Sequence, residues 1–369
     1  MDFEILSADG EDAARWTALI HRLPPALRDI HFLPEYGRIY RDSHGFEPLL
    51  AVYRSGKEFV LQPFVRRPLR DLPFLAGMPD RGQFFDIANP YGFGGPLCSA
   101  TNTAAAHDLY ARFAAAFGAW CCNGRIASEF ACLHPLMQGH QEATIRGILT
   151  PQLEKNVVII DLRPSEEEIL RRVRKGHRSS IALAQRRGIR VVKVAPNNEN
   201  LAVFHEIYSA TMMRRRAAPR WLLPLEYFNA TIRELGEERT SLCVAYVGSE
   251  VESACMLIHD FATAYYHFAG TRAEHADSGV NNLLVWHSAM SVKKAGYQRL
   301  HLGGGVTRSP DDTLLRFKSG FSKDGVPLYS YFTVRHAAAY NQLCERKRAF
   351  ERATAGAESE SDFMPLYRR

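Results

Sequence analysis

The chain is poor in cysteine, and its cysteines form no pattern typical of a disulfide framework or a metal site. There are 7 cysteines in 369 residues, an odd number without any C-x-x-C spacing, which indicates a protein kept in a reducing compartment. The adjacent Cys121 and Cys122 lie in an alanine-rich helical pattern, which favours packing over metal binding. The sequence therefore predicts no metal site.

The chain also lacks a long hydrophobic run. The longest candidate, FAAAFGAWCCNG, is shorter than the ~18 apolar residues needed to span a bilayer. The first residues, MDFEILSADGEDAARW, carry acids where a secretory signal would carry a basic segment. We therefore expect no transmembrane segment and a cytoplasmic location.

The glycine run in HLGGGVTRSPDDTLLRFKSGFS (301–322) lacks the spacing of a nucleotide-binding loop. A Walker A loop needs G-x-x-x-x-G-K-[ST], and no lysine stands at that offset after the glycines. A dinucleotide fingerprint needs G-x-G-x-x-G after the first strand of a βαβ unit, whereas this run follows a late strand. We interpret the glycines as a strand-end turn where the backbone passes close to a neighbour, which is either part of the chain or a substrate.

Strand and helix patterns alternate along the chain, which predicts an α/β fold with mixed sheets. Residues 47–67 read as two strands joined at Ser55–Gly56, and KNVVIID (155–161) reads as a buried strand that opens a second block. A helix is expected over 165–187, because Ser165 and Glu168 have capping-box spacing. A three-strand meander, a helix and a last strand, PLYSYFTV, follow.

Length and composition indicate two domains. We place the first domain at 1–153 and the second at 154–350. The remaining residues, 351–369, lack apolar periodicity and are expected to form a mobile tail.

Positive charge is concentrated on the helix expected over 165–187. The net charge of the chain is only +6, so a nucleic acid would have to be bound by a local cluster. Such a cluster is formed by Arg171, Arg172, Arg174, Lys175, Arg178, Arg186, Arg187 and Arg190. No acid follows Glu168 in this helix, which favours phosphate binding over a solvated helix face that balances Glu166–Glu168.

Three stretches together resemble a known family: LRRVRKGHRSSIALAQRRGIRV (170–191), FHEIYSATMMRRRAAPRWLLPLEYF (204–228) and LHLGGGVTRSPDDTLLRFKSGF (300–321). In order and spacing they resemble the Fem-type branch of the GNAT superfamily, and FLPEYGRIYRDSHGFEPLLAVY and NPYGFGGPL match its first half. The resemblance implies two GNAT-like domains in tandem and the transfer of an amino acid from aminoacyl-tRNA to an amine acceptor. The chain has no long coiled-coil insertion, which some cell-wall members carry.

The resemblance implies that Phe317 and Lys318, in RFKSGF, lie at the transfer centre. There Lys318 would contact the terminal ribose–phosphate or stabilise the oxyanion that develops during attack on the ester; the alternative is a surface lysine beside a core phenylalanine. The segment with Thr211 and Arg214, one helical turn apart, would line the acceptor site. Trp221 is either an apolar wall of that site or a core residue.

Four further residues are candidates for the same site. Tyr266 and His267 are neighbours in a strand, so their side chains point to opposite faces and one of them should face the cleft. His267 is a candidate acceptor of the amine proton, although lone histidines are more often structural. Tyr36, in the PEY motif, resembles the edge of the acceptor channel between domains, and Gly304 would give a substrate close access.

Two groups of charged residues complete the prediction. Asp311 and Asp312 are expected to cap the short helix that carries Phe317 and Lys318. A tRNA acceptor arm would be bound by Arg171, Arg174, Lys175, Arg178 and Arg186.

The leading hypothesis is therefore an aminoacyl-tRNA-dependent aminoacyltransferase without a cofactor, acting on a small-molecule or peptide amine in natural-product (antibiotic) biosynthesis or on a peptidoglycan precursor. The alternative is an acyl-CoA-dependent N-acyltransferase of the same fold. The loop GTRAEHADSGVNN weakens it, because its acids would repel a CoA pyrophosphate. A non-catalytic RNA-binding protein is the third hypothesis, but no stacking-aromatic RNP pattern supports it.

Overall fold

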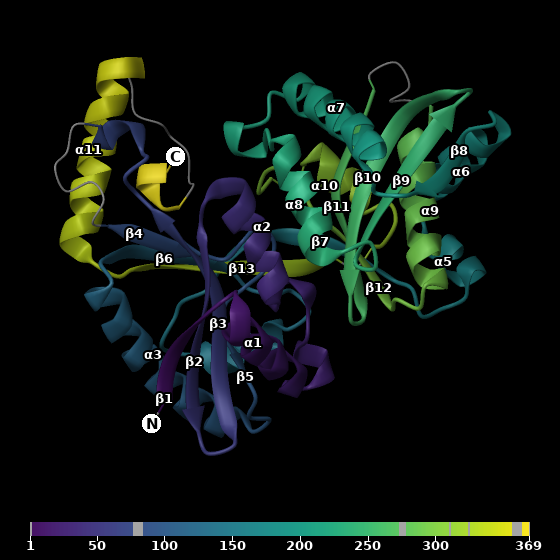
Figure 1. Cartoon of the computed structure of the whole chain (residues 1–369). Helices are drawn as coiled ribbons and strands as arrows, with labels where there is room; N and C mark the ends of the chain where they lie inside the picture. Colours follow the sequence, from purple (N-terminus) through teal and green to yellow (C-terminus); the bar gives the residue numbers. More distant parts are fainter. Residues whose placement is uncertain are drawn as a thin grey trace. The chain divides into compact units, whose positions relative to one another are not determined.

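The structure is a computed structural model that describes residues 2–76, 84–272, 278–309, 311–323, 325–355 and 364–368. The chain forms two compact units (Figure 1). Unit 1 comprises Met1–Leu153 and Leu328–Arg369, and unit 2 comprises Glu154–Pro327. In the described part of the chain, no helix combines the length and the apolar character that crossing a membrane requires.

Unit 1 is built on a mixed sheet with the strand order β1-β2-β3-β4-β6-β13, and β5 pairs with β3. The strands are β1 (Asp2–Ser7), β2 (Glu47–Ser55), β3 (Glu58–Pro68), β4 (Phe85–Ala88), β5 (Leu97–Cys98), β6 (Ile126–Cys132) and β13 (Gly325–Val334). The hairpin predicted at Ser55–Gly56 is confirmed: Ser55 pairs with Glu58, and Gly56 adopts φ 61°, which glycine tolerates best.

The helices of unit 1 cover its sheet and build its core. They are α1 (Gly10–Arg22), α2 (Pro34–His44), α3 (Thr103–Asn123), α4 (Gln138–Ile145) and α11 (Ala337–Ala355). Helix α3 is capped by Asn102, whose side chain accepts the N–H of Ala105 at 3.0 Å. Its buried Phe113 and Phe117 pack into one apolar cluster with residues of β2, β3 and β6.

The C-terminal part of the chain differs from the prediction. The prediction placed residues up to 350 in the second domain, whereas Leu328–Arg369 belongs to unit 1. Of the tail expected to be mobile, 351–369, only residues 351–355 and 364–368 are among the described residues. The physical reason lies at Asp86, which is 1% exposed. Its carboxylate accepts from Arg67 Nε at 2.8 Å, from Arg368 Nε at 2.6 Å and from the Tyr367 hydroxyl at 3.1 Å. Tyr367 itself is buried in the cluster formed with α11.

Replacing Arg368 by Ala is expected to destabilise unit 1 by about 1–3 kcal/mol, because a buried carboxylate loses one of its two cations. Burial alone would raise the pKa of Asp86, but Arg67 and Arg368 hold it below its ordinary value. Denaturant unfolding measures the change, with Arg346→Ala on the exposed side of α11 as the control. An unchanged midpoint for Arg368→Ala would show that the C-terminal contact contributes nothing.

Unit 2 has the strand order β7-β12-β11-β10-β9-β8. The strands are β7 (Gln152–Asp161), β8 (Arg190–Val194), β9 (Thr240–Val247), β10 (Glu250–Asp260), β11 (Thr263–Thr271) and β12 (Arg299–Gly304). The helices are α5 (Glu166–Arg172), α6 (Lys175–Arg186), α7 (Asn198–Arg214), α8 (Leu225–Leu235), α9 (Val280–Lys294) and α10 (Thr313–Lys318). The predicted antiparallel meander is β9–β10–β11, and β11 pairs with β12 in parallel.

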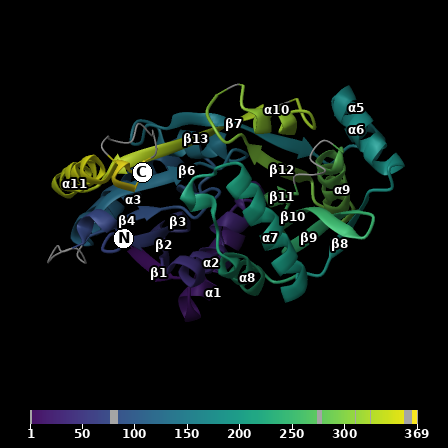
Figure 2. The same ribbon diagram turned by 90° about the horizontal axis from the view of Figure 1, so that it is seen from above.

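Helices cover both faces of the unit 2 sheet (Figure 1). Helices α6 and α9 pack on one face through a cluster that includes Ile181 and Leu284. Helices α7 and α8 pack on the other face, where the rings of Tyr208, Phe228 and Phe268 meet edge to face. Helix α10 lies beside the end of β12 (Figure 2).

The helix predicted over 165–187 is two helices, α5 and α6, separated at Val173–Arg174. Its expected start is confirmed, since the Ser165 hydroxyl accepts the N–H of Glu168 at 3.2 Å. The break has a tertiary cause: Val173 and Arg174 have non-helical ψ angles of 135° and 140°, and the Arg174 N–H donates to the carbonyl of Gly320 at 2.8 Å. A bond to a distant carbonyl thus replaces one within a continuous helix.

Candidate functional site

The three glycines at the end of β12 make room for three charged side chains of unit 2. A Cβ on Gly303, which adopts φ 76°, would lie 3.3 Å from Lys318 Nζ, and one on Gly304 would lie 2.8 Å from Lys155 Cδ. A Cβ on Gly305 would meet the Asp312 carboxylate at 2.4 Å. Side chains of the chain itself are therefore close neighbours of this run, and the predicted access of a substrate at Gly304 stays a prediction.

Two lysines converge on this strand end. Lys318 Nζ donates to the carbonyl of Gly304 at 2.8 Å, and Lys155 Nζ donates to the carbonyl of Gly305 at 2.9 Å. Burial, and after it the Lys155 ammonium, lowers the pKa of Lys318 to about 7, although the Asp312 carboxylate acts in the opposite direction. An amine with this pKa exchanges protons readily near neutral pH. No motif in the sequence singles out Lys155, which lies on β7.

Asp312 connects the glycine turn to α10. One carboxylate oxygen accepts the N–H of Leu315 at 2.9 Å and so caps the helix, as predicted. The other oxygen accepts the backbone N–H groups of Val306 and Thr307 at 2.9 and 2.8 Å. Burial alone would raise the pKa of Asp312, but these bonds hold it below its ordinary value. Asp311, the other predicted cap, instead lies 3.4 Å from Arg316.

His177 of α6 holds the other end of α10. Its Nε2 donates to the carbonyl of Phe317 at 2.8 Å, and its ring packs against those of Phe317 and Phe321 at centroid distances of 5.3 and 4.9 Å. Burial lowers the pKa of His177, which keeps the ring neutral. Gly320 is required beside it, because a Cβ there would lie 2.2 Å from His177 Nε2. His177 was not predicted, and only the tertiary structure reveals it.

The predicted basic residues have different surroundings. Arg171, Arg174 and Lys175 are exposed around the start of α6, where an Arg174 guanidinium nitrogen lies 3.5 Å from the Arg316 carbonyl on α10. Arg178 is half-buried and donates to the carbonyls of Arg171 and Val173, so it closes the end of α5. Arg186 is exposed at the opposite end of α6.

Thr211 and Arg214 lie on α7 and bind the end of β11. The Thr211 hydroxyl accepts the N–H of Thr271 at 2.9 Å, and the Arg214 guanidinium donates to the carbonyl of Thr271 at 2.6 Å. Both residues therefore join α7 to the sheet. Their predicted role in binding an acceptor stays a prediction.

The aromatic candidates fall on two faces of the unit 2 sheet. Tyr266 packs into the cluster that includes α6 and α9, whereas His267 bonds the Tyr227 hydroxyl of α8 at 3.1 Å. The expected opposite orientation is thus found, and His267 lies at the β-bulge between the β10–β11 register pairs. Trp221 is half-buried in the 3-10 turn Pro219–Trp221, and its carbonyl accepts from the Tyr208 hydroxyl at 2.5 Å.

In unit 1, Tyr36 is fully buried and its hydroxyl donates to the carbonyl of Tyr91 in the NPYGFGG loop. Phe93 of the same loop packs on His31 and His134, with centroid distances of 5.0 and 4.8 Å. Tyr36 and the two histidines therefore hold this loop in place.

Asp29, His31 and His134 are buried close enough together to suggest a metal site. His31 Nδ1 lies 2.6 Å from Asp29 Oδ1, and His134 Nε2 lies 3.4 Å from Asp29 Oδ2. His134 Nδ1, however, accepts the N–H of Leu136 at 3.2 Å, so the proton of this ring is on Nε2, facing Asp29. This arrangement fits a hydrogen-bonded network better than metal coordination, because a metal ion would need a lone pair on His134 Nε2.

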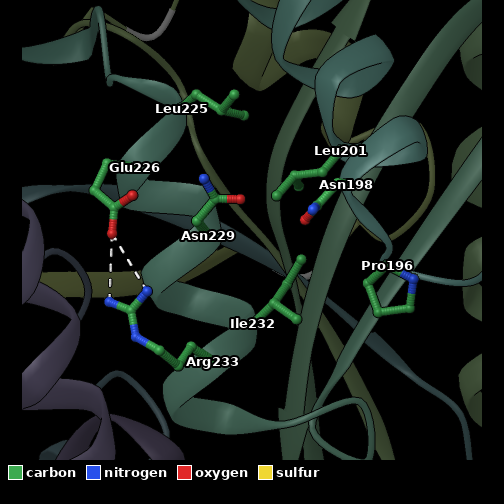
Figure 3. A pocket seen from close by; sticks show the side chains of 8 residues that line it. All are labelled: Pro196, Asn198, Leu201, Leu225, Glu226, Asn229, Ile232 and Arg233. Carbon is green, nitrogen blue, oxygen red and sulfur yellow. Dashed lines mark hydrogen bonds and ion pairs between the residues drawn. The ribbon is translucent and has the colours of Figure 1, made fainter.

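A groove of about 580 Å³ lies between α7 and α8 (Figure 3). It is lined by Pro196, Asn198, Leu201, Leu225, Glu226, Asn229, Ile232 and Arg233. Glu226 and Arg233 form an ion pair at its edge, with 3.3 Å between the charged atoms. None of the predicted site residues lines this groove.

The acidic loop GTRAEHADSGVNN, which weakens the CoA hypothesis, is only partly described. Residues 273–277 lie outside the described residues. Arg272, which precedes them, donates to the carbonyl of Val251 at 3.0 Å and pairs with Glu206 at 2.9 Å.

Comparison with known proteins supports the fold. Residues 171–319 match the family model described as an acetyltransferase (GNAT) domain. FemX has a similar structure, with a TM-score of 0.69 and 11% identity, over 93% of this chain and 99% of that one. A tandem GNAT protein from the clavulanic acid biosynthesis pathway has a TM-score of 0.52 and 10% identity, over 91% and 99% of the two chains.

A third similar structure, L-PGS from Bacillus licheniformis, has a TM-score of 0.52 and 11% identity, over 93% of this chain and 97% of that one. No curated protein matches the sequence. At identities of 10–11%, these structures show a shared fold and no more. The family model matches residues 171–319, which include Lys318. The protein thus contains a GNAT domain in its second unit, over residues 171–319, and the chain as a whole is similar in fold to FemX and to a tandem GNAT protein.

Proposed function

We propose that the protein is an aminoacyltransferase that moves an amino acid from aminoacyl-tRNA to the amine of a small molecule or peptide, without a cofactor. The coarser activity, acyl transfer, follows from the GNAT domain. The observation that carries the finer proposal is the position of Lys318, whose pKa is lowered to about 7, on a helix bonded directly to the basic helix α6.

The reaction needs a base but no covalent enzyme intermediate, because the ester of an aminoacyl-tRNA is already activated. The acceptor nitrogen attacks the ester carbonyl carbon, a C–N bond forms, and the bond from that carbon to the ribose oxygen breaks. The neutral Lys318 amine accepts the proton lost by the nitrogen and returns it to the leaving ribose oxygen. A group with a pKa near the working pH serves both steps well.

The tRNA would be bound where α5 and α6 meet α10. Arg171, Arg174 and Lys175 are exposed there, and the Arg174 N–H and His177 bind carbonyls on either side of Lys318. Phosphate contacts on this surface would therefore be made close in the fold to the proposed base.

Replacing Arg171, Arg174 and Lys175 together by Ala is expected to weaken tRNA binding and to reduce the slope of log K against log salt by about 2–3, if each residue neutralises one phosphate. The matched control replaces Lys57, Arg70 and Arg112, three exposed basic residues of unit 1, and so makes the same change in net charge. Binding of uncharged tRNA over a range of salt concentrations measures the affinity and the salt slope of both triple variants. Equal losses in the two triple variants would contradict a local tRNA surface.

Incubation with pools of charged tRNA and candidate amines, read by mass spectrometry for an added residue, tests the proposal. We expect transfer that RNase abolishes. Full activity with an acyl-CoA and no tRNA would contradict it.

The family description, an acetyltransferase domain, favours one alternative: transfer of an acyl group from CoA by the same fold. Specific binding of CoA in a calorimeter, with acylation of an amine, would support this second function. The two proposals differ in the donor and share the fold.

A further inference from the structure

Lys155 and Lys318 reach the same strand end from different elements. Lys155 lies on β7 and Lys318 ends α10, yet their amines donate to the carbonyls of consecutive residues, Gly305 and Gly304, at 2.9 and 2.8 Å. Both side chains are half-buried. Two like charges brought together out of solvent repel each other unless one gives up its proton.

The backbone is shaped to admit Lys155. Gly304 pairs with Val157 of β7, and a Cβ on Gly304 would lie 2.8 Å from both Lys155 Cδ and the carbonyl oxygen of Asn156. The aliphatic part of Lys155 thus lies against the Cα of Gly304. No other residue type leaves this space, so the position of Lys155 depends on the glycine run.

We propose that Lys155 is a positioning residue of the transfer site, which holds the Lys318 amine in place and in its neutral, proton-accepting form. This inference rests on the proposed role of Lys318 as the base. Lys155 does not touch the reacting atoms; it acts through Lys318 and through the carbonyl of Gly305, next to the carbonyl that Lys318 binds.

The other charged groups around Lys318 do not replace Lys155. Asp312, at the start of α10, favours the charged form of Lys318 but already accepts bonds from Leu315, Val306 and Thr307. On β7, Glu154 pairs with Arg308 at 2.8 Å. His177 of α6 is held neutral by burial and binds the Phe317 carbonyl. Arg174, which precedes α6, and Arg316 of α10 are exposed. Lys155 is therefore the neighbouring cation that acts on Lys318.

The test measures the protonation of Lys318 in the free protein. Trace acetic anhydride modifies only neutral amines, and mass spectrometry of the peptide that carries Lys318 gives the extent of modification at each pH. In the native protein we expect half-maximal modification near pH 7. In Lys155→Met and Lys155→Gln, which remove the charge, we expect the profile to move up by about one to two pH units.

Three variants separate charge from shape. Lys155→Arg keeps the charge and should keep the native profile, while Lys155→Gln keeps a hydrogen-bond donor without the charge. Lys323→Met, at an exposed lysine, should change nothing. In the transfer reaction, the rising limb of the pH–rate profile should move to higher pH in Lys155→Met and Lys155→Gln, by the same amount as the modification profile.

An unchanged modification profile in Lys155→Gln with native circular dichroism would overturn the inference. The protein could also show the expected shift of the modification profile and yet transfer no amino acid from any charged tRNA. That result would support the pairing of Lys155 with Lys318 and would overturn the proposed function. The two failures are therefore distinguishable.

Discussion

Lys318→Met is expected to lower the rate of aminoacyl transfer by about a hundred- to a thousandfold, without changing the stability of the protein. The variant removes the amine that accepts and returns the proton, and Met fills the half-buried space. The residual activity would come from binding and orientation of the two substrates. Single-turnover transfer from charged tRNA, with circular dichroism of both proteins, measures the effect.

The pH dependence gives a second signature of the same residue. Because the pKa of Lys318 is lowered to about 7, the neutral amine gains population as the pH rises from 6 to 8, and the native rate should rise over this range and then level off. Lys318→Arg keeps a charge that cannot be removed and should not restore activity. Lys323→Met, five positions further along, is the matched control and should transfer normally. Native rates in Lys318→Met would contradict the proposed base.

Arg335→Met is expected to destabilise unit 1 by about 3–5 kcal/mol, because it leaves a buried carboxylate without its cation. Glu129 is 2% exposed, and its carboxylate accepts from Arg335 Nε at 2.8 Å, from Gln62 Nε2 at 2.6 Å and from the Tyr331 hydroxyl at 2.7 Å. The two neutral donors cannot balance the charge. Hydrogen exchange of the β6 amides in denaturant reports the stability of this unit.

The control for this prediction is Arg112→Met, which breaks an exposed ion pair with Asp108 at 3.6 Å and should cost less than about 1 kcal/mol. Adding Glu129→Gln to Arg335→Met removes the buried charge as well and should recover part of the lost stability. If the single variant were as stable as the native protein, the network would not contribute to unit 1.

Much of the fold could be predicted from local sequence. The hairpin at Ser55–Gly56, the meander β9–β11 and the helix start at Ser165 were predicted and are found. Each depends on residues within a few positions of one another, through turn conformation, side-chain alternation or capping. The α/β fold class was predicted from the alternation of strand and helix patterns, and the tandem arrangement was implied by the resemblance. Both agree with the similar structures.

The division of the chain at its C-terminal end could not be predicted in this way. The strand PLYSYFTV was recognised as a strand, yet from Leu328 on it belongs to unit 1, where it pairs with β6. The last described residues are held at Asp86 by an ion pair with Arg368. Which sheet a strand joins depends on partners far away in sequence, and local patterns carry no information about them.

The sequence by itself determined local features: the hairpin at Ser55–Gly56, the meander, the helix start at Ser165 and the capped helix of Phe317 and Lys318. Only the tertiary structure decided which side chains the glycines accommodate, which are Lys318, Lys155 and Asp312. The reason is physical: capping and periodicity act over a few residues, whereas the lysine pair exists only because strand pairing places β7 against β12.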